Sequence, residues 1–289
     1  ASSAASDVYK RQRQDQARQQ DVKFISASEP QYTFSSPECR HSTLYMEKRA
    51  VEGEPTVFSE TFEFTANGEW HNLKPEDVQP YDTTTALYKE YTAEREKHIV
   101  FSPRLRELAA KLTAGETNPY LKAKRIFRWV NDNFPWASAR EYSTIENIPE
   151  YVLDNRHGDC GQVSLLFITL CRISGIPAHF QSGFMMHPRA WNLHDWAEVY
   201  FEGVGWVPVD QSFGIPAFAR NADEEYFFLG GIDSWRMIVN TDYGMPLQPE
   251  KQYPRSETVD FQRGEVEWEG GNLYFPQWGY HMDIDYLNY

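Results

Sequence analysis

Cys160, His194 and Asp210 have the types and the chain order of a nucleophile, its base and an orienting carboxylate. Cys160 stands at the predicted start of a helix, where unpaired backbone N–H groups and the helix dipole favour the reactive thiolate. Gly158 and Gly161 flank it and keep the approach open for a bulky acyl group. The alternative is a small buried cysteine that only packs. The chemistry that this position predicts is attack by sulfur on a carbonyl carbon.

His194 and Asp210 fall in two neighbouring predicted strands. His194 lies in an alternating run that places it on one strand face with Trp196 and Glu198. An odd-length loop around residues 203–205 would keep His194 and Asp210 on the same face, whereas a two-residue turn would separate them. On a shared face the carboxylate accepts the ring N–H and stabilises the imidazolium. Taken singly, each is also an ordinary strand or turn residue.

The elements around these residues have clear start and stop signals. Ser102-Pro103 and Asn118-Pro119 each combine an N-cap with a first-turn proline, so helices are expected to begin there. A third helix is expected to begin at Cys160 and to end at Gly175. Strands are then expected over residues 178–183, 193–201 and 206–210. A β-rich start, a helical middle and antiparallel strands together predict an α+β fold.

We divide the chain into four segments. Residues 1–23 are polar and rich in Gln and Arg, and residues 7–12 match the translation of a transposase end used in sequencing adapters. We expect this segment to be disordered and adapter-derived, with the native N-terminus missing. The other three are an N-terminal β-sandwich-like module at 24–100, a catalytic core at 101–218 and a C-terminal β-rich extension at 219–289.

Several blocks between residues 102 and 214 occur in a characteristic order. They are Gly158-x-Cys160, Ser174-Gly175-Ile176-Pro177-Ala178, His194-x-Trp196-x-Glu198-Val199-Tyr200 and Gly205-Trp206-Val207-x-Val209-Asp210. This order resembles the transglutaminase-like superfamily, in particular bacterial proteins that carry such a domain. The resemblance implies a papain-like core, with a helical part and an antiparallel sheet, and a catalytic triad of Cys160, His194 and Asp210.

The resemblance also suggests the rest of the site. Papain-like enzymes place a glutamine shortly before the cysteine, and residues 153–156 contain none. Transglutaminases use a tryptophan indole as oxyanion donor, and Trp136 matches that role, although it is equally an ordinary core or rim aromatic. The Cys160 backbone N–H is the second expected donor. The expected residues of the substrate cleft are Gly158, Gly161, Gln162 and Trp196.

The implied activity is acyl transfer from amide or peptide bonds through a thioester on Cys160. Water as second nucleophile makes a protease or amidase, and an amine makes a cross-linking transglutaminase. Of these two activities we favour the hydrolase. The expected substrate is a protein, a peptide or another amide such as peptidoglycan. The alternative is a non-catalytic module that binds peptides or glycans on the same fold.

Composition excludes several other classes. The net charge is −14 without a compensating basic stripe, which argues against a nucleic-acid partner. The 3 cysteines, without a CxxC pair, argue against a disulfide scaffold and a zinc site, and we expect neither a metal nor a cofactor. The longest apolar run is far shorter than the roughly 20 residues of a membrane span. We expect a periplasmic or surface location.

Overall fold

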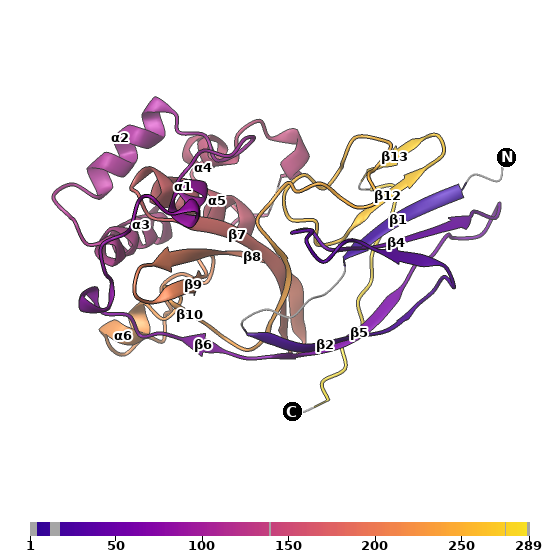
Figure 1. The fold of residues 1–289 in the computed structure, drawn as a ribbon, viewed down its shortest axis with the longest axis horizontal. Coiled ribbons are helices and arrows are strands. Elements are labelled where there is room, and N and C mark those ends of the chain that lie inside the picture. The colour runs from indigo at the N-terminus through magenta and orange to yellow at the C-terminus, as the bar shows by residue number, and fades with distance from the viewer. Residues whose placement is uncertain (1–4, 12–17, 139, 275, 288–289) are drawn as a thin grey trace. The chain divides into compact units, whose positions relative to one another are not determined.

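The computed structural model describes the chain except residues 1–4, 12–17, 139, 275 and 288–289 (Figure 1). The chain divides into two compact units. The core unit comprises Asn67–Gln181 and His194–Ser234, and the β unit comprises Ala1–Ala66, Ser182–Leu193 and Trp235–Tyr289. Every helix in the described ranges belongs to the core unit, and none of them is long and apolar enough to cross a membrane.

The core unit is built around one buried helix. Its α-helices are α1 (Ala86–Tyr91), α2 (Pro103–Leu112), α3 (Pro119–Asn133), α4 (Ile148–Asn155), α5 (Cys160–Ile173) and α6 (Ala222–Glu225), and its 3₁₀ turns are η1 (Pro75–Asp77) and η2 (Tyr142–Thr144). α5 contacts α2, α3 and α4 and is buried on all sides from Gly161 to Arg172. Such burial explains its almost uniformly apolar sequence.

The predicted helix starts are confirmed. Ser102 accepts a hydrogen bond from the backbone N–H of Leu105, and Asn118 accepts one from Leu121, in each case with proline in the first turn. These caps satisfy N–H groups that have no partner inside the helix.

A four-stranded sheet has the order β11-β7-β8-β9. Its strands are β7 (Ala178–His187), β8 (Ala190–Phe201), β9 (Gly205–Val209) and β11 (Arg236–Thr241). β8 and β9 form an antiparallel hairpin in which Phe201 pairs with Gly205 and Ala197 with Val209. The loop between the strands therefore has three residues, 202–204. This odd length, as predicted, keeps residues of equal parity on one face of the hairpin.

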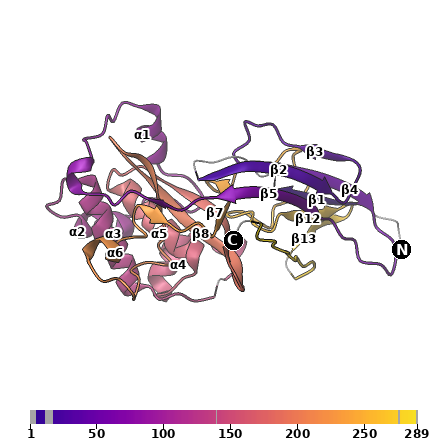
Figure 2. The ribbon, with the colours of Figure 1, turned by 90° about the horizontal axis from the view of Figure 1, so that it is seen from below.

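Short strands complete the two units. The core unit also contains the pair β6 (Glu69–Trp70) and β10 (Gly231–Ile232). In the β unit, the pair β2 (Gln19–Ala27) and β5 (Glu60–Ala66) lies side by side in Figure 2. A five-stranded sheet of the β unit has the order β13-β12-β1-β4-β3. Its members are β1 (Ala5–Arg11), β3 (Tyr32–Phe34), β4 (Thr43–Arg49), β12 (Glu265–Trp268) and β13 (Gly271–Leu273).

The N-terminal segment differs from the disorder that its composition suggests. β1 pairs with β4 along its whole length and with β12 on its other side. A strand between two partners is held by backbone hydrogen bonds, which do not depend on apolar side chains. Further along, the buried Gln19 amide bonds both the N–H and the C=O of Ile238, at 2.8 and 3.0 Å. The adapter origin of this segment stays a prediction, and residues 12–17 lie outside the described ranges.

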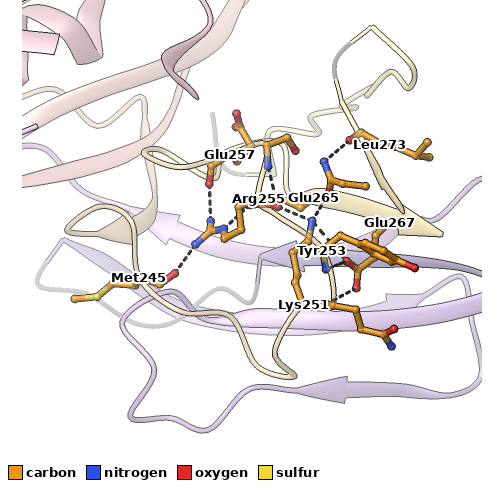
Figure 3. Close-up of polar contacts among 11 residues, drawn as sticks. Met245, Lys251, Tyr253, Arg255, Glu257, Glu265, Glu267 and Leu273 are labelled. Carbon is orange, nitrogen blue, oxygen red and sulfur yellow. Dashed lines mark hydrogen bonds and ion pairs between the residues drawn. The ribbon is translucent and has the colours of Figure 1, made fainter. Parts of the chain in front are cut away.

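A buried charge cluster holds the loop that precedes β12. Lys251 Nζ lies 2.7 Å from Glu265 Oε2 and 3.9 Å from Glu267 Oε2, and Arg255 Nε lies 2.5 Å from Glu265 Oε1. Figure 3 shows these side chains converging. The Lys251 side chain is 4% exposed and that of Glu265 is 0% exposed. Each charge therefore needs the others as replacements for water.

Lys251→Met is expected to destabilise the protein by about 2–4 kcal/mol, because it leaves the buried Glu265 and Glu267 undercompensated. Urea unfolding measures the change. The matched control is Lys23→Met, which breaks the exposed pair with Glu63 and is expected to change stability by less than about 0.5 kcal/mol. Equal effects of the two substitutions would contradict the role of burial.

Candidate active site

Cys160 is the first residue of α5, held there by a capping box. Asp159 is the N-cap: its Oδ1 accepts the N–H of Gln162 at 2.9 Å, and Gln162 Oε1 accepts the N–H of Asp159 at 3.2 Å. This reciprocal pair fixes the first turn of the helix. The thiol is consequently carried at a helix N-terminus, as predicted, and the residue is half-buried.

Trp136 lies beside the turn that leads into Cys160. Its segment forms a parallel bridge with Gly158, in which the Ala137 N–H donates to the Gly158 carbonyl at 3.0 Å. The Trp136 side chain is 63% exposed. The chain thus places the exposed residue Trp136 next to the residues that immediately precede the thiol, although the two positions are far apart in sequence.

The structure brings His194 and Asp210 together. His194 Nε2 lies 2.8 Å from Asp210 Oδ2, and the two side chains are 5% and 0% exposed. The other carboxylate oxygen, Oδ1, accepts the backbone N–H of Phe213 at 3.0 Å. Asp210 is therefore held from two directions. A carboxylate at Nε2 favours the tautomer that carries its proton there, which directs the lone pair of the neutral ring to Nδ1.

The thiol of Cys160 contacts Asp195, the residue after His194. The distance from Sγ to Asp195 Oδ2 is 3.7 Å, within hydrogen-bonding range for sulfur, and Asp195 is 2% exposed. Strand alternation assigns Asp195 to the face opposite to His194. Sequence spacing alone could not show that the tip of α5 would meet this side chain.

The surroundings of Cys160 favour the thiol over the thiolate. Burial raises the pKa of Cys160 well above its ordinary value, and the carboxylates of Asp195, Asp159 and Asp210 raise it further. The backbone N–H of Asp195 acts in the opposite direction but is outweighed. Desolvation and nearby negative charge thus act against the effect of the helix N-terminus, which by itself favours the thiolate.

The four expected cleft residues lie inside the protein. Gln162 is 1% exposed and acts in the capping box. Trp196 is 0% exposed and donates its indole N–H to Gln181 at 2.6 Å. Gly158 and Gly161 are buried as well. These positions support the site from within, and their role as residues of a substrate cleft stays a prediction.

The sequence did not predict that Tyr142, Asp159 and Asp195 belong to the site. The Tyr142 hydroxyl lies 2.7 Å from both carboxylate oxygens of Asp159. A Cβ added at Gly161 would lie 2.3 Å from that hydroxyl and 2.7 Å from Asp195 Oδ2. The Asp-x-x-Gln spacing predicts the capping box. No neighbouring residue pattern predicts the contact with Tyr142, because the whole of α4 lies between Tyr142 and Asp159 in the chain.

Gly161→Ala is expected to reduce stability by about 1–3 kcal/mol and to displace Tyr142 or Asp195, because the added methyl group overlaps both. Thermal unfolding and the alkylation rate of Cys160 measure the two effects. Gly279→Ala serves as the control, since a Cβ there meets nothing within 4 Å. Unchanged stability and unchanged thiol reactivity in Gly161→Ala would contradict this close packing.

Among the described residues, no group of three or more His, Cys, Asp or Glu side chains is placed to hold a metal ion. The polar side chains of the site form two hydrogen-bonded pairs, the Cys160 thiol with the Asp195 carboxylate and the His194 imidazole with the Asp210 carboxylate. Such a set is suited to proton transfer and nucleophilic attack.

Residues 106–211 match the family described as the transglutaminase-like superfamily. The matched range contains Trp136, Cys160, His194 and Asp210. Its limits fall inside the core region expected from the sequence.

Relatives with this similarity occur in several bacteria. The uncharacterized protein YebA of Bacillus subtilis is 27% identical over 140 residues, which cover 42% of this chain and 19% of that protein. The protein-glutamine gamma-glutamyltransferase of Pseudomonas aeruginosa is 23% identical over 125 residues, which cover 39% of this chain and 19% of that protein. The chain thus spans about a fifth of the length of these two relatives.

A crystal structure from Cytophaga hutchinsonii, described as that of a candidate cysteine protease, has a similar fold. Its TM-score is 0.54 at 18% identity, with coverage of 82% of this chain and 80% of that one. The predicted fold class, an α+β papain-like transglutaminase fold, is confirmed.

Proposed function

Because the chain carries a domain of the transglutaminase-like superfamily at residues 106–211, we propose that it is a cysteine-dependent enzyme that acts on amide bonds through a thioester on Cys160. The main support is the buried His194–Asp210 pair, joined at 2.8 Å. The carboxylate of Asp210 is also among the charges that raise the pKa of Cys160, which supports a His194–Asp210 pair close enough to serve the thiol.

Acylation uses the imidazole twice. His194 Nδ1 takes the proton of the Cys160 thiol while Sγ attacks the carbonyl carbon of the amide. The imidazolium then gives this proton to the departing nitrogen as the C–N bond breaks, which leaves a thioester and a free amine or ammonia. Asp210 stabilises the imidazolium through Nε2 between the two steps. Since the resting cysteine favours the thiol, the base is needed within the reaction itself.

Two donors are suited to the oxyanion that forms during attack. Cys160 is the first residue of α5, and the backbone N–H groups of a first helical turn have no partner within the helix. Trp136 is exposed beside Gly158 and supplies an indole N–H as the second donor. One such donor contributes about 10²–10³-fold to the rate in comparable sites.

We propose water as the usual second nucleophile, which makes the enzyme a protease or amidase. His194 takes a proton from water as the water oxygen attacks the thioester carbonyl. The C–S bond then breaks, the imidazolium returns the proton to Cys160 Sγ, and the carboxylic acid leaves. A primary amine in place of water would give a cross-linked product, the reaction after which the Pseudomonas relative is named. We further propose a protein or peptide substrate and an extracytoplasmic location.

The experiment offers casein together with a fluorescent primary amine. Ammonia release, new peptide N-termini and amine incorporation are followed in parallel. We expect ammonia or new N-termini to exceed incorporated amine and to disappear after full alkylation of Cys160. If incorporated amine exceeded both ammonia and new N-termini, the enzyme would be a cross-linking transglutaminase. Binding of casein without any product would contradict catalysis and would favour a non-catalytic peptide-binding module.

A further inference from the structure

Asp195 is a buried carboxylate at the nucleophile that the proposed reaction does not use. It belongs to β8, directly after His194, and is 2% exposed. Its Oδ2 lies 3.7 Å from Cys160 Sγ, with the thiol as the donor. A buried carboxylate in contact with a nucleophile influences whether that nucleophile keeps its proton.

The other titratable groups around the thiol are held by other donors. From the start of α5, Asp159 accepts the Tyr142 hydroxyl of η2 and the N–H of Gln162. Just after β9, Asp210 accepts from His194 of β8 and from the N–H of Phe213. The Asp195 carboxylate presents Oδ2 to Sγ itself. Its charge therefore acts on the S–H group at the shortest range.

We propose that Asp195 is a positioning residue that holds the proton on Cys160 Sγ while the site is empty. The S–H group donates to Oδ2 of the ionised carboxylate. When substrate binds, His194 Nδ1 accepts that proton, the S–H bond breaks and an N–H bond forms, while Asp195 remains a carboxylate. The arrangement protects the resting cysteine, because alkylation and oxidation act on the thiolate.

The charge of Asp195 changes the pKa of Cys160 in the direction that the proposal requires. Asp195 is the first charged group, after burial, that raises the pKa of Cys160. Neutralising it should lower the pKa of the thiol and increase the thiolate fraction at neutral pH. A decrease of one unit raises that fraction about tenfold. The weaker nucleophilicity of a more acidic thiolate reduces the gain in alkylation rate to about threefold.

The test measures the rate of iodoacetamide alkylation of Cys160 between pH 6 and pH 10 by peptide mass spectrometry, without substrate. Asp195→Asn is expected to react about three- to tenfold faster at pH 7 and to shift the pH profile to lower values. Asp195→Glu, which keeps the charge, should retain slow alkylation. The matched control is Glu198→Gln on the same strand, whose carboxylate lies 3.2 Å from His179 Nε2 and should leave the profile unchanged.

Thermal unfolding of each variant shows whether it is folded, and Asp195→Ala replaces the asparagine variant if that one is not. A folded neutral variant that alkylates at the wild-type rate or more slowly would overturn the proposal and leave Asp195 a packing residue. The protective role of Asp195 rests on the proposed function, but the alkylation experiment that tests it does not depend on catalysis. If casein were never turned over, the alkylation profile would still decide the role of Asp195.

Discussion

Cys160→Ala is expected to abolish amide turnover, with a loss of at least about 10⁴-fold in kcat. The sulfur forms the covalent intermediate, so without it the remaining groups can only bind and polarise the substrate. The residue is half-buried at the start of α5, and removal of a single sulfur there should leave the fold intact. Ammonia release from casein, measured beside thermal unfolding, separates lost chemistry from lost structure.

The matched control for this prediction is Cys39→Ala. Cys39 is also half-buried and free, but it belongs to the β unit. We expect it to keep full activity. Turnover that survives in Cys160→Ala, or that disappears equally in Cys39→Ala, would contradict the assignment of the nucleophile.

Asp210→Asn is expected to lower kcat by about 10⁴-fold while preserving the fold. Asparagine has nearly the same shape and can still accept the Phe213 N–H that Asp210 Oδ1 accepts at 3.0 Å. Its amide group can donate to His194 Nε2, which moves the ring proton to Nδ1 and removes the lone pair needed for the thiol. It also cannot stabilise an imidazolium by charge. Steady-state kinetics and thermal unfolding of the variant measure the effect.

Asp154→Asn is the control for this second prediction, because that carboxylate is 66% exposed and pairs with Arg104 on the surface of the core unit. It should leave kcat unchanged. A folded Asp210→Asn variant with activity within tenfold of the wild type would show that the His194–Asp210 pair serves structure and not catalysis.

Local rules predicted much of the site. Ser102 and Asn118 begin helices because an N-cap oxygen followed by proline has a defined role wherever it occurs. The pairing of His194 with Asp210 follows from the three-residue loop of the β8–β9 hairpin, since parity along two joined strands is also a local property. Cys160 begins α5 for the same kind of reason.

Long-range properties could not be predicted in this way. The partner of the thiol depends on which strand face meets the tip of α5, and the pattern around Asp195 does not contain that information. The shift of the Cys160 pKa depends on how deeply the helix start is buried and on carboxylates from separate elements. Likewise, β1 pairs through its backbone with β12, which lies near the other end of the chain. Side-chain composition cannot predict pairing of this kind.

The most direct test of the account is to trap the acyl enzyme. Protein incubated with casein is quenched in acid, digested and analysed by peptide mass spectrometry, with and without hydroxylamine. We expect an acyl group on the peptide that contains Cys160, released by hydroxylamine as a thioester is, and absent from Cys160→Ala. Turnover without any acylated Cys160, or an adduct that persists in Cys160→Ala, would contradict the central claim.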